Sequence, residues 1–128
     1  MTNILNRLMA DNKGRGLFRV DNQADEVTIY LYDVIVSDSD WGGVSAIEFV
    51  RELAAIDAAT IVHLRINSPG GEVFAAQAMA QAIRDRQGKT VAHVDGLAAS
   101  SASWLAMTAD EVVISEGGMM MIHQAMTF

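Results

Sequence analysis

Two side chains near the end of the sequence could carry out acyl chemistry. Ser100 lies in residues 96–103, a small-residue segment that follows a predicted strand and begins a helix. A helix N-terminus stabilises developing negative charge, which favours a nucleophile there. His123 follows the apolar residues 119–122, so its ring can emerge at the carboxyl edge of a sheet, where ligands bind in open α/β folds. Ser100 as nucleophile and His123 as its base would support acyl transfer, although a helix cap and a structural histidine are the alternatives.

A glycine-rich turn provides a second candidate element. Asn67-Ser68-Pro69-Gly70-Gly71 follows a predicted strand and precedes a predicted helix. Pro69 fixes one φ angle and the two glycines permit positive φ, so that backbone amides can point toward one spot. With the helix dipole, these amides could bind an anion or an oxyanion. An ordinary strand-to-helix turn is the alternative.

The remaining histidines and a cluster of acidic residues predict no further site. His63 and His93 lie inside predicted strands, where we expect packing or a hydrogen bond. Asp33, Asp38 and Asp40 match no metal-binding loop template, so a solvated loop is expected. We therefore predict neither a metal nor a cofactor.

Alternating secondary-structure elements must position these residues. Strands are expected at residues 17–20, 27–35, 60–66, 90–94, 112–114 and 119–122. Helices are expected from Ser45, where Ser45 and Glu48 form an S-x-x-E capping box, and over residues 73–86 and 99–107. Residues 96–98 are expected to form a turn. This order predicts an α/β fold with largely parallel strands, in one domain over residues 16–128 that follows a flexible tail at 1–15.

Composition limits the class of protein. The 128 residues carry a net charge of −7 and no cysteine, which argues against a nucleic-acid surface and a disulfide framework. The sequence shows neither a secretory signal nor a transmembrane run. We expect a cytoplasmic protein that binds neither nucleic acid nor membrane.

Three segments in this order resemble the proteolytic subunit family of the Clp protease (ClpP). They are INSPGG at residues 66–71, GLAAS at 96–100 and MIHQ at 121–124, and the similarity runs from about Thr28 to the end. The resemblance implies a crotonase-like stack of strand-strand-helix units and a ring, of heptamer type, around an enclosed chamber. It implies a serine endopeptidase with Ser100 as nucleophile, His123 as base and the backbone N–H groups of Gly71 and Ser101 as oxyanion hole. It leaves the natural substrate and any ATPase partner open.

Other features resemble the phage and prophage branch of that family. They are VDGLAASSAS at residues 94–103, Trp41-Gly42-Gly43 and the acidic stretch before Trp41. In this branch the enzyme commonly acts in head maturation on capsid or scaffold protein. The resemblance therefore implies a host-cytoplasmic or procapsid location.

The sequence departs from the family pattern at its C-terminal end. The family's triad aspartate lies several tens of residues after the histidine, whereas Phe128 is five residues after His123. We therefore expect a fold truncated at the C-terminus, a weak or inactive peptidase, and apolar side chains around Met119–Met121 that are exposed or covered by a neighbouring subunit.

Three other functions fit parts of the pattern. An acyl-CoA enzyme of the same fold would use a similar oxyanion hole with different acid-base groups. A non-catalytic ring or assembly component would need no triad aspartate. A membrane-bound signal-peptide peptidase is disfavoured, because such enzymes use lysine as base and the chain shows no membrane anchor.

Overall fold

The computed structural model describes residues 18–23, 25–38 and 42–123. The predicted tail at 1–15 lies outside the described residues. The elements, in chain order, are β1 (Phe18–Gln23), β2 (Glu26–Leu31), β3 (Ile35–Val36), β4 (Val44–Ser45), α2 (Ala46–Ala54), β5 (Ile61–Ser68), α3 (Val73–Asp85), β6 (Thr90–Ala99), α4 (Ser101–Thr108), β7 (Glu111–Ile114) and β8 (Met119–Met121).

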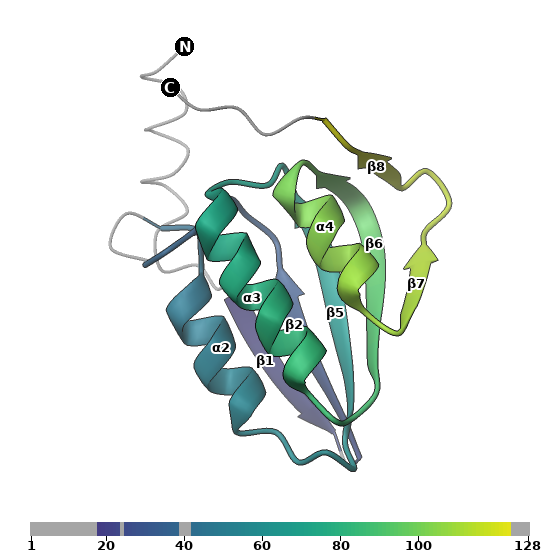
Figure 1. The fold of residues 1–128 in the computed structure, drawn as a ribbon. Helices are drawn as coiled ribbons and strands as arrows, with labels where there is room; N and C mark the ends of the chain where they lie inside the picture. The colour runs from purple at the N-terminus through teal and green to yellow at the C-terminus, as the bar shows by residue number, and fades with distance from the viewer. Residues whose placement is uncertain (1–17, 24, 39–41, 124–128) are drawn as a thin grey trace.

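One mixed sheet forms the centre of the fold (Figure 1). Its strand order is β1-β2-β5-β6-β7, and β8 also pairs with β6. β1 runs antiparallel to β2, and β2, β5, β6 and β7 are parallel to one another. Parallel neighbours need crossover connections, which α2, α3 and α4 supply in turn. The predicted α/β fold with largely parallel pairing is confirmed.

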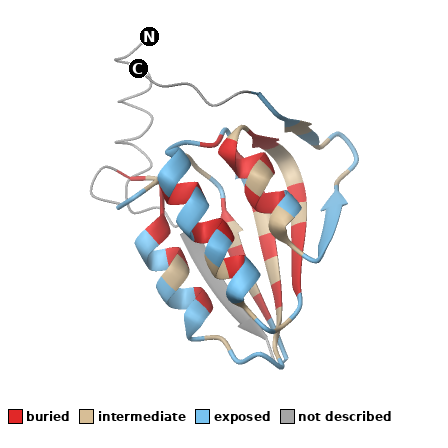
Figure 2. Cartoon of the chain, viewed as in Figure 1, coloured by how far each residue is buried: buried red, intermediate tan, exposed pale blue. Residues whose placement is uncertain are grey.

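The helices α2, α3 and α4 of the described residues lie on one face of the sheet, and the hydrophobic core fills the space between the two layers (Figures 1 and 2). On β5, Val62, Leu64 and Ile66 point into this core, as the alternating sequence predicts, while His63 and Arg65 lie on the opposite face. The helix layer contributes mainly small side chains from α3 and α4 and the larger Phe49 and Leu53 from α2.

Helix α2 begins where the sequence predicts but buries a partly different stripe. Ser45 is its N-cap, and the Ser45 hydroxyl accepts a hydrogen bond from the Glu48 amide at 3.2 Å. The buried side chains are Ala46, Phe49 and Leu53, whereas Ile47 is 53% exposed. The helical spacing of Ile47, Val50, Leu53 and Ala54 predicts the buried stripe. Leu53 is buried and Val50 packs against the core as predicted, but the aromatic Phe49 takes the core position expected for Ile47.

Two strand boundaries also differ from the predictions. The expected strand at 27–35 is two strands, because the chain leaves the ladder after Leu31 and β3 pairs with β4 instead. The expected turn at 96–98 lies inside β6, which continues to Ala99 because its last residues pair with β8. Long-range pairing overrides the local turn signal of Gly96.

Among the described helices, none has the length and the apolar character needed to span a bilayer.

Candidate functional site

The glycine-rich turn after β5 is held in place by neighbouring backbone and by one buried hydroxyl. The Ser68 hydroxyl donates to the Asp33 carbonyl at 2.6 Å and accepts from the Gly70 amide at 3.1 Å. The Ile35 amide donates to the Gly70 carbonyl at 2.8 Å, and the Glu72 amide donates to the Ile35 carbonyl at 3.0 Å. In this parallel bridge the N–H of Gly71 points away from Ile35, so the bridge does not use it.

Gly70 brings this turn into direct contact with the start of α4. A Cβ added at Gly70 would lie 2.7 Å from the Ala99 carbonyl oxygen, 2.9 Å from the Ser100 Cβ and 3.1 Å from the Ser101 nitrogen. Its φ of +96° is also one that side-chain-bearing residues rarely adopt. Only glycine therefore allows the two turns to approach this closely.

Ser100 occupies a strained bend between β6 and α4. Its φ of 55° and ψ of −126° make it the non-glycine residue with positive φ within the described part of the chain. The Ser100 hydroxyl does not cap α4, and the Ser103 amide and hydroxyl both bond to the Ser100 carbonyl instead. A sharp strand-to-helix bend of this kind exposes a serine side chain at the top of a sheet.

The amides of Gly71 and Ser101 lie beside the contact between the two turns, and we refer to them as the two-amide site. Ser101 is the first residue of α4, so its N–H belongs to the helix end that has no intrahelical acceptor. The hydroxyl of Ser101 is buried and has no hydrogen-bond partner among the described residues. Two amides at the starts of adjacent helices can stabilise the negative charge that develops on a carbonyl oxygen.

A third contact links the strands that carry these turns. The Asn67 side-chain oxygen accepts a hydrogen bond from the Leu97 amide at 3.1 Å, and a Cβ at Gly96 would lie 2.7 Å from the same oxygen. The β5–β6 register shifts at this point. Asn67 and Gly96 thus act as a pair that aligns the two strand ends.

His123 lies two residues beyond a strand that pairs with the nucleophile segment. β8 runs beside β6 with Met121 opposite Ala99, and the Ser100 amide donates to the Met121 carbonyl at 2.8 Å. This pairing brings the segment before His123 to the Ser100 bend. The direct pairing of the Ser100 hydroxyl with the imidazole of His123 stays a prediction.

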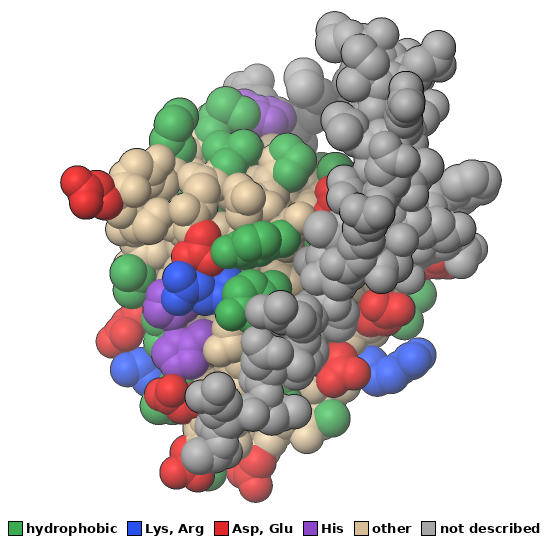
Figure 3. All heavy atoms as spheres, turned by 180° about the vertical axis from the view of Figure 1, so that it is seen from behind, with side chains coloured by type: hydrophobic (Ala, Val, Ile, Leu, Met, Phe, Trp, Pro, Cys, Tyr) green, Lys and Arg blue, Asp and Glu red, His purple; other side chains and the backbone are tan. Residues whose placement is uncertain are grey.

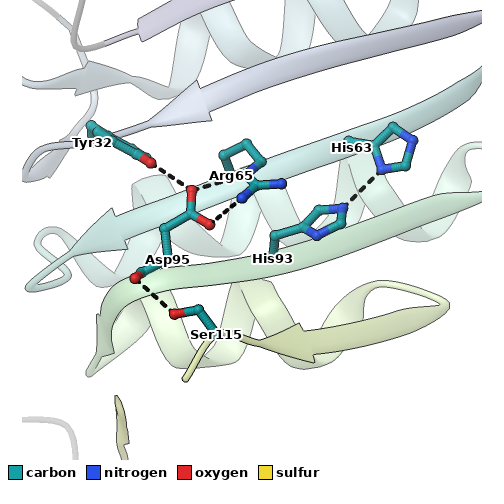
Figure 4. Close-up of polar contacts among 6 residues, drawn as sticks. All are labelled: Tyr32, His63, Arg65, His93, Asp95 and Ser115. Carbon is teal, nitrogen blue, oxygen red and sulfur yellow. Dashed lines mark hydrogen bonds and ion pairs between the residues drawn. The ribbon is translucent and has the colours of Figure 1, made fainter. Parts of the chain in front are cut away.

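The open face of the sheet carries a separate polar network, seen from behind in Figure 3 and enlarged in Figure 4. Arg65 binds Asp95 through two hydrogen bonds of 2.9 and 2.6 Å, and the Tyr32 hydroxyl donates to the same carboxylate at 2.5 Å. Beside this group, the His63 Nδ1 and the His93 Nε2 are 2.8 Å apart. The predicted hydrogen-bonding role of the two histidines is confirmed, while their independence from catalysis stays a prediction.

These contacts set the ionisation of the network. Burial and the hydrogen bond to Asp95 raise the pKa of Tyr32 to about 12. Burial alone would raise the pKa of Asp95, but the hydrogen bonds from Arg65 and Tyr32 outweigh it and hold that pKa below its ordinary value. Burial, followed by the charge of Arg65, lowers the pKa of His93. Asp95 therefore forms a stable ion pair with Arg65 on the open face of the sheet.

The described residues contain no group of three or more histidine, aspartate or glutamate side chains that could bind a metal ion.

The roles of three residues that shape the site were not predicted from the sequence. Ser68 and Ile35 hold the glycine-rich turn, and Asn67 fits against Gly96. The sequence did contain an indication of these roles, since Asn67 and Ser68 lie close to two glycines and short polar side chains often form hydrogen bonds with turn backbone. Ile35 carried no such signal, since it contributes only its backbone.

The fold belongs to the crotonase-like class. Similar solved structures include an enoyl-CoA hydratase from Bacillus anthracis, with a TM-score of 0.66 and 14% sequence identity over 82% of this chain and 50% of that one. A second is an enoyl-CoA hydratase from Polaromonas sp., with a TM-score of 0.65 and 14% identity over 80% of this chain and 49% of that one. A third, from Mycobacterium avium subsp. paratuberculosis, has a TM-score of 0.64 and 20% identity over 83% of this chain and 50% of that one. The chain spans about half the length of these structures. The predicted crotonase-like fold class is confirmed.

Residues 38–127 match the sequence model of a family described as NfeD1b, N-terminal domain. This match covers most of the chain, so the chain belongs to the NfeD1b N-terminal domain family. The comparison with curated proteins finds no match.

These findings correct the predicted family and activity. Placing the chain in the Clp protease family is wrong, because the matching family is that of the NfeD1b N-terminal domain. The predicted serine endopeptidase and its head-maturation role are contradicted as well, because the similar structures are enoyl-CoA hydratases. The physical reason lies in the motifs themselves. The residues of NSPGG and GLAAS form the tight contacts between two strand-to-helix turns, so they report the geometry of the fold and do not distinguish between its families.

Proposed function

We propose that the chain binds an acyl thioester at the two-amide site and acts as an acyl-CoA enzyme of the crotonase-like class. One observation carries the proposal: Gly70 packs directly on Ser100 and Ser101, which brings the amides of Gly71 and Ser101 to the starts of two adjacent helices. The enoyl-CoA hydratase fold of the similar structures supports an acyl-CoA ligand.

The site would act on the thioester carbonyl. Two N–H donors would bind the carbonyl oxygen most strongly when it carries negative charge, so they would stabilise an enolate or a tetrahedral state more than the bound substrate. Ser100 and His123 are the candidate groups for moving protons there, because Ser100 is at the bend and the β8 pairing brings the chain near His123 to it. These roles of Ser100, His123, Gly71 and Ser101 are part of the proposal.

Self-association is the partner prediction that the crotonase-like fold supports. The size of the assembly and any ATPase partner stay open. A non-catalytic role in assembly is the second candidate, favoured by the exposed apolar side chains of β7 and β8.

The experiment removes one amide without removing its helix. Proline at the first position of a helix deletes an N–H that has no intrahelical acceptor and keeps the helical φ. Ser101→Pro therefore deletes one donor of the two-amide site. Val73→Pro makes the same change at the start of α3, outside the two-amide site, and is the matched control.

Binding of crotonyl-CoA and of free CoA is measured by titration calorimetry, and turnover of crotonyl-CoA by loss of its conjugated-thioester absorbance. We expect the wild-type chain and Val73→Pro to bind crotonyl-CoA more tightly than CoA. We expect turnover to fall by roughly 10²-fold in Ser101→Pro, as for loss of one oxyanion donor. Equal affinity for the two ligands, or equal behaviour of the two proline variants, would overturn the proposal.

A further inference from the structure

The Gly71 N–H of the two-amide site belongs to a peptide unit that joins two glycines. Gly70 has a φ of +96° and Gly71 a φ of +154°. Because neither residue has a Cβ, rotation of the peptide between them meets less steric hindrance than elsewhere in a chain. Half a turn of this peptide would replace the Gly71 N–H by the Gly70 C=O and present an acceptor in place of a donor. The site therefore needs contacts that fix this one peptide.

The orientation of the peptide is set by a hydrogen bond to its carbonyl. The Gly70 carbonyl accepts from the Ile35 amide at 2.8 Å. In a planar trans peptide, the C=O and the N–H point in opposite directions. The bond to Ile35 therefore directs the Gly71 N–H away from β3, toward the side on which Gly70 contacts Ser100 and Ser101.

Ile35 can hold this carbonyl only while β3 stays against the turn. β3 is two residues long, and its strand partner β4 is equally short. A two-stranded ladder of this length is weak by itself. Contacts between β3 and the glycine-rich turn must therefore keep β3 in place.

Two side chains of the turn fasten the chain on either side of Ile35. The Ser68 hydroxyl donates to the Asp33 carbonyl at 2.6 Å. The Ser37 amide and the Ser37 hydroxyl both donate to the Oε2 of Glu72, at 2.7 and 2.5 Å. Residues 33, 35 and 37 alternate along the chain, so all three direct backbone groups to the same side, as in a strand.

The carboxylate of Glu72 takes the place of a strand acceptor. Ile35 bonds to the backbone of Gly70 and Glu72, so in a continued parallel ladder the Ser37 amide would bond next to the Glu72 carbonyl. That carbonyl instead accepts from the Ala76 amide at 3.0 Å, because α3 begins here. The Glu72 side chain makes no capping hydrogen bond to α3, and its carboxylate is used for Ser37.

We infer that Glu72 is a positioning residue of the two-amide site, which acts through Ser37 and β3 on the peptide between Gly70 and Gly71. The inference rests on the proposed function, in which the Gly71 N–H binds the thioester carbonyl. Loss of the carboxylate releases the end of β3 at Ser37, so the bond from Ile35 to Gly70 opens more often. Binding of the carbonyl then weakens with the fraction of molecules that present the N–H.

Amide hydrogen exchange of the ligand-free chain tests the positioning without requiring activity. Glu72→Ala removes the acceptor, whereas Glu72→Gln keeps an oxygen that can accept both bonds, since both go to Oε2. Glu52→Ala removes an exposed carboxylate from α2 and is the matched control. We expect the Ile35 amide to exchange roughly 10-fold faster in Glu72→Ala, and at close to the wild-type rate in the other two variants. The amide of Leu64, in the centre of β5, should exchange equally in all four proteins, which shows that the change is local.

Two results of the exchange experiment would overturn the inference. One is equal protection of Ile35 in the wild type and in Glu72→Ala. The other is an equal loss of protection in Glu72→Gln and Glu72→Ala, since the hydrogen bonds to Ser37 would then not be the cause.

Turnover of crotonyl-CoA connects the positioning to the site. Glu72→Ala should lower turnover by roughly 10-fold, less than the roughly 10²-fold expected for a deleted donor. Its affinity for free CoA should be unchanged, because free CoA has no thioester carbonyl, and Glu72→Gln should recover most of the turnover. Wild-type turnover in Glu72→Ala would contradict the inference. A wild-type chain that shows the expected exchange but does not bind crotonyl-CoA would contradict the proposed function and still support the positioning by Glu72.

Discussion

Ser100 shows how a single residue can combine backbone strain with a candidate chemical role. Its positive φ is unfavourable for any residue with a side chain, and the surrounding contacts hold it there. Gly70 packs against Ser100 on one side, and on another the Met121 carbonyl accepts a hydrogen bond from the Ser100 amide. Strain that is maintained in this way is common at functional sites.

Replacing Ser100 by glycine should therefore raise stability. Glycine relieves the positive-φ strain but increases the entropy of the unfolded chain, so the net gain should be about 1 kcal/mol. Ser100→Ala keeps the strain and should change stability by less than about 0.5 kcal/mol. Urea denaturation of both variants measures the difference. Equal free energies of unfolding for the two variants would show that the bend is not strained.

His93 should make the fold sensitive to mild acid. Burial, the charge of Arg65 and the neighbouring His63 lower the pKa of His93, and the charge of Asp95 opposes them. Glu26 contacts the Nε2 of His63, on the side of that ring away from His93. Below about pH 6.5 the unfolded chain protonates this histidine more readily than the folded one. The folded state binds fewer protons, so stability falls as the pH drops.

The check compares free energies of unfolding at about pH 7.5 and about pH 5.5, on either side of the ordinary histidine pKa. The wild type should lose more stability between these values than His93→Gln does. Because the substitution also removes the hydrogen bond to His63, only the change with pH is compared. The same loss in both proteins would rule out His93 as the cause.

At the scale of elements, the local signals in the sequence locate helix starts well. The S-x-x-E pattern at Ser45 gives the N-cap of α2, and the small-residue segment after Ala99 gives α4. Strand ends are located less well. β6 runs through the predicted turn at 96–98, and the strand predicted at 27–35 is divided.

Ser45→Ala should destabilise the fold by about 1 kcal/mol, because the Glu48 amide loses its acceptor at the end of α2. Ser45→Asp retains an acceptor and adds a favourable charge at the helix start, so it should stay close to the wild type. Thermal unfolding followed by circular dichroism at 222 nm, the helix band, compares the two. A loss of stability in Ser45→Asp as large as in Ser45→Ala would mean that burial of Ser45, not capping, is what matters.

For the whole molecule, one face of the sheet carries the core and the other carries the polar network of Arg65 and Asp95 (Figures 2 and 4). Phe49 is the largest fully buried side chain, and it joins α2 to this core. The stability of the two-layer fold should therefore depend strongly on it.

Phe49→Ala should cost about 3–5 kcal/mol, through lost burial and the cavity left behind. Ile47→Ala on the same helix should cost less than about 1 kcal/mol, because Ile47 is half exposed. Urea denaturation of both variants gives the comparison. A similar cost for the two substitutions would mean that α2 packs differently from the described structure.

The sequence by itself determined the alternation of the main strands and helices, the parallel α/β class and the glycine-rich turn after β5. These features depend on local patterns: alternation in residues 60–66, the cap at Ser45 and the glycines of the NSPGG turn. Such patterns act within a few residues, so they are visible in a single sequence.

Only the tertiary structure decided which residues meet. The contact of Gly70 with Ser100, the fit of Asn67 against Gly96 and the ion pair of Arg65 with Asp95 each join segments about thirty residues apart. The same is true of the choice of Phe49 over Ile47 for the core, which depends on the shape of the sheet beneath α2. Pairing and packing energies between distant segments decide these features, and no local pattern encodes them.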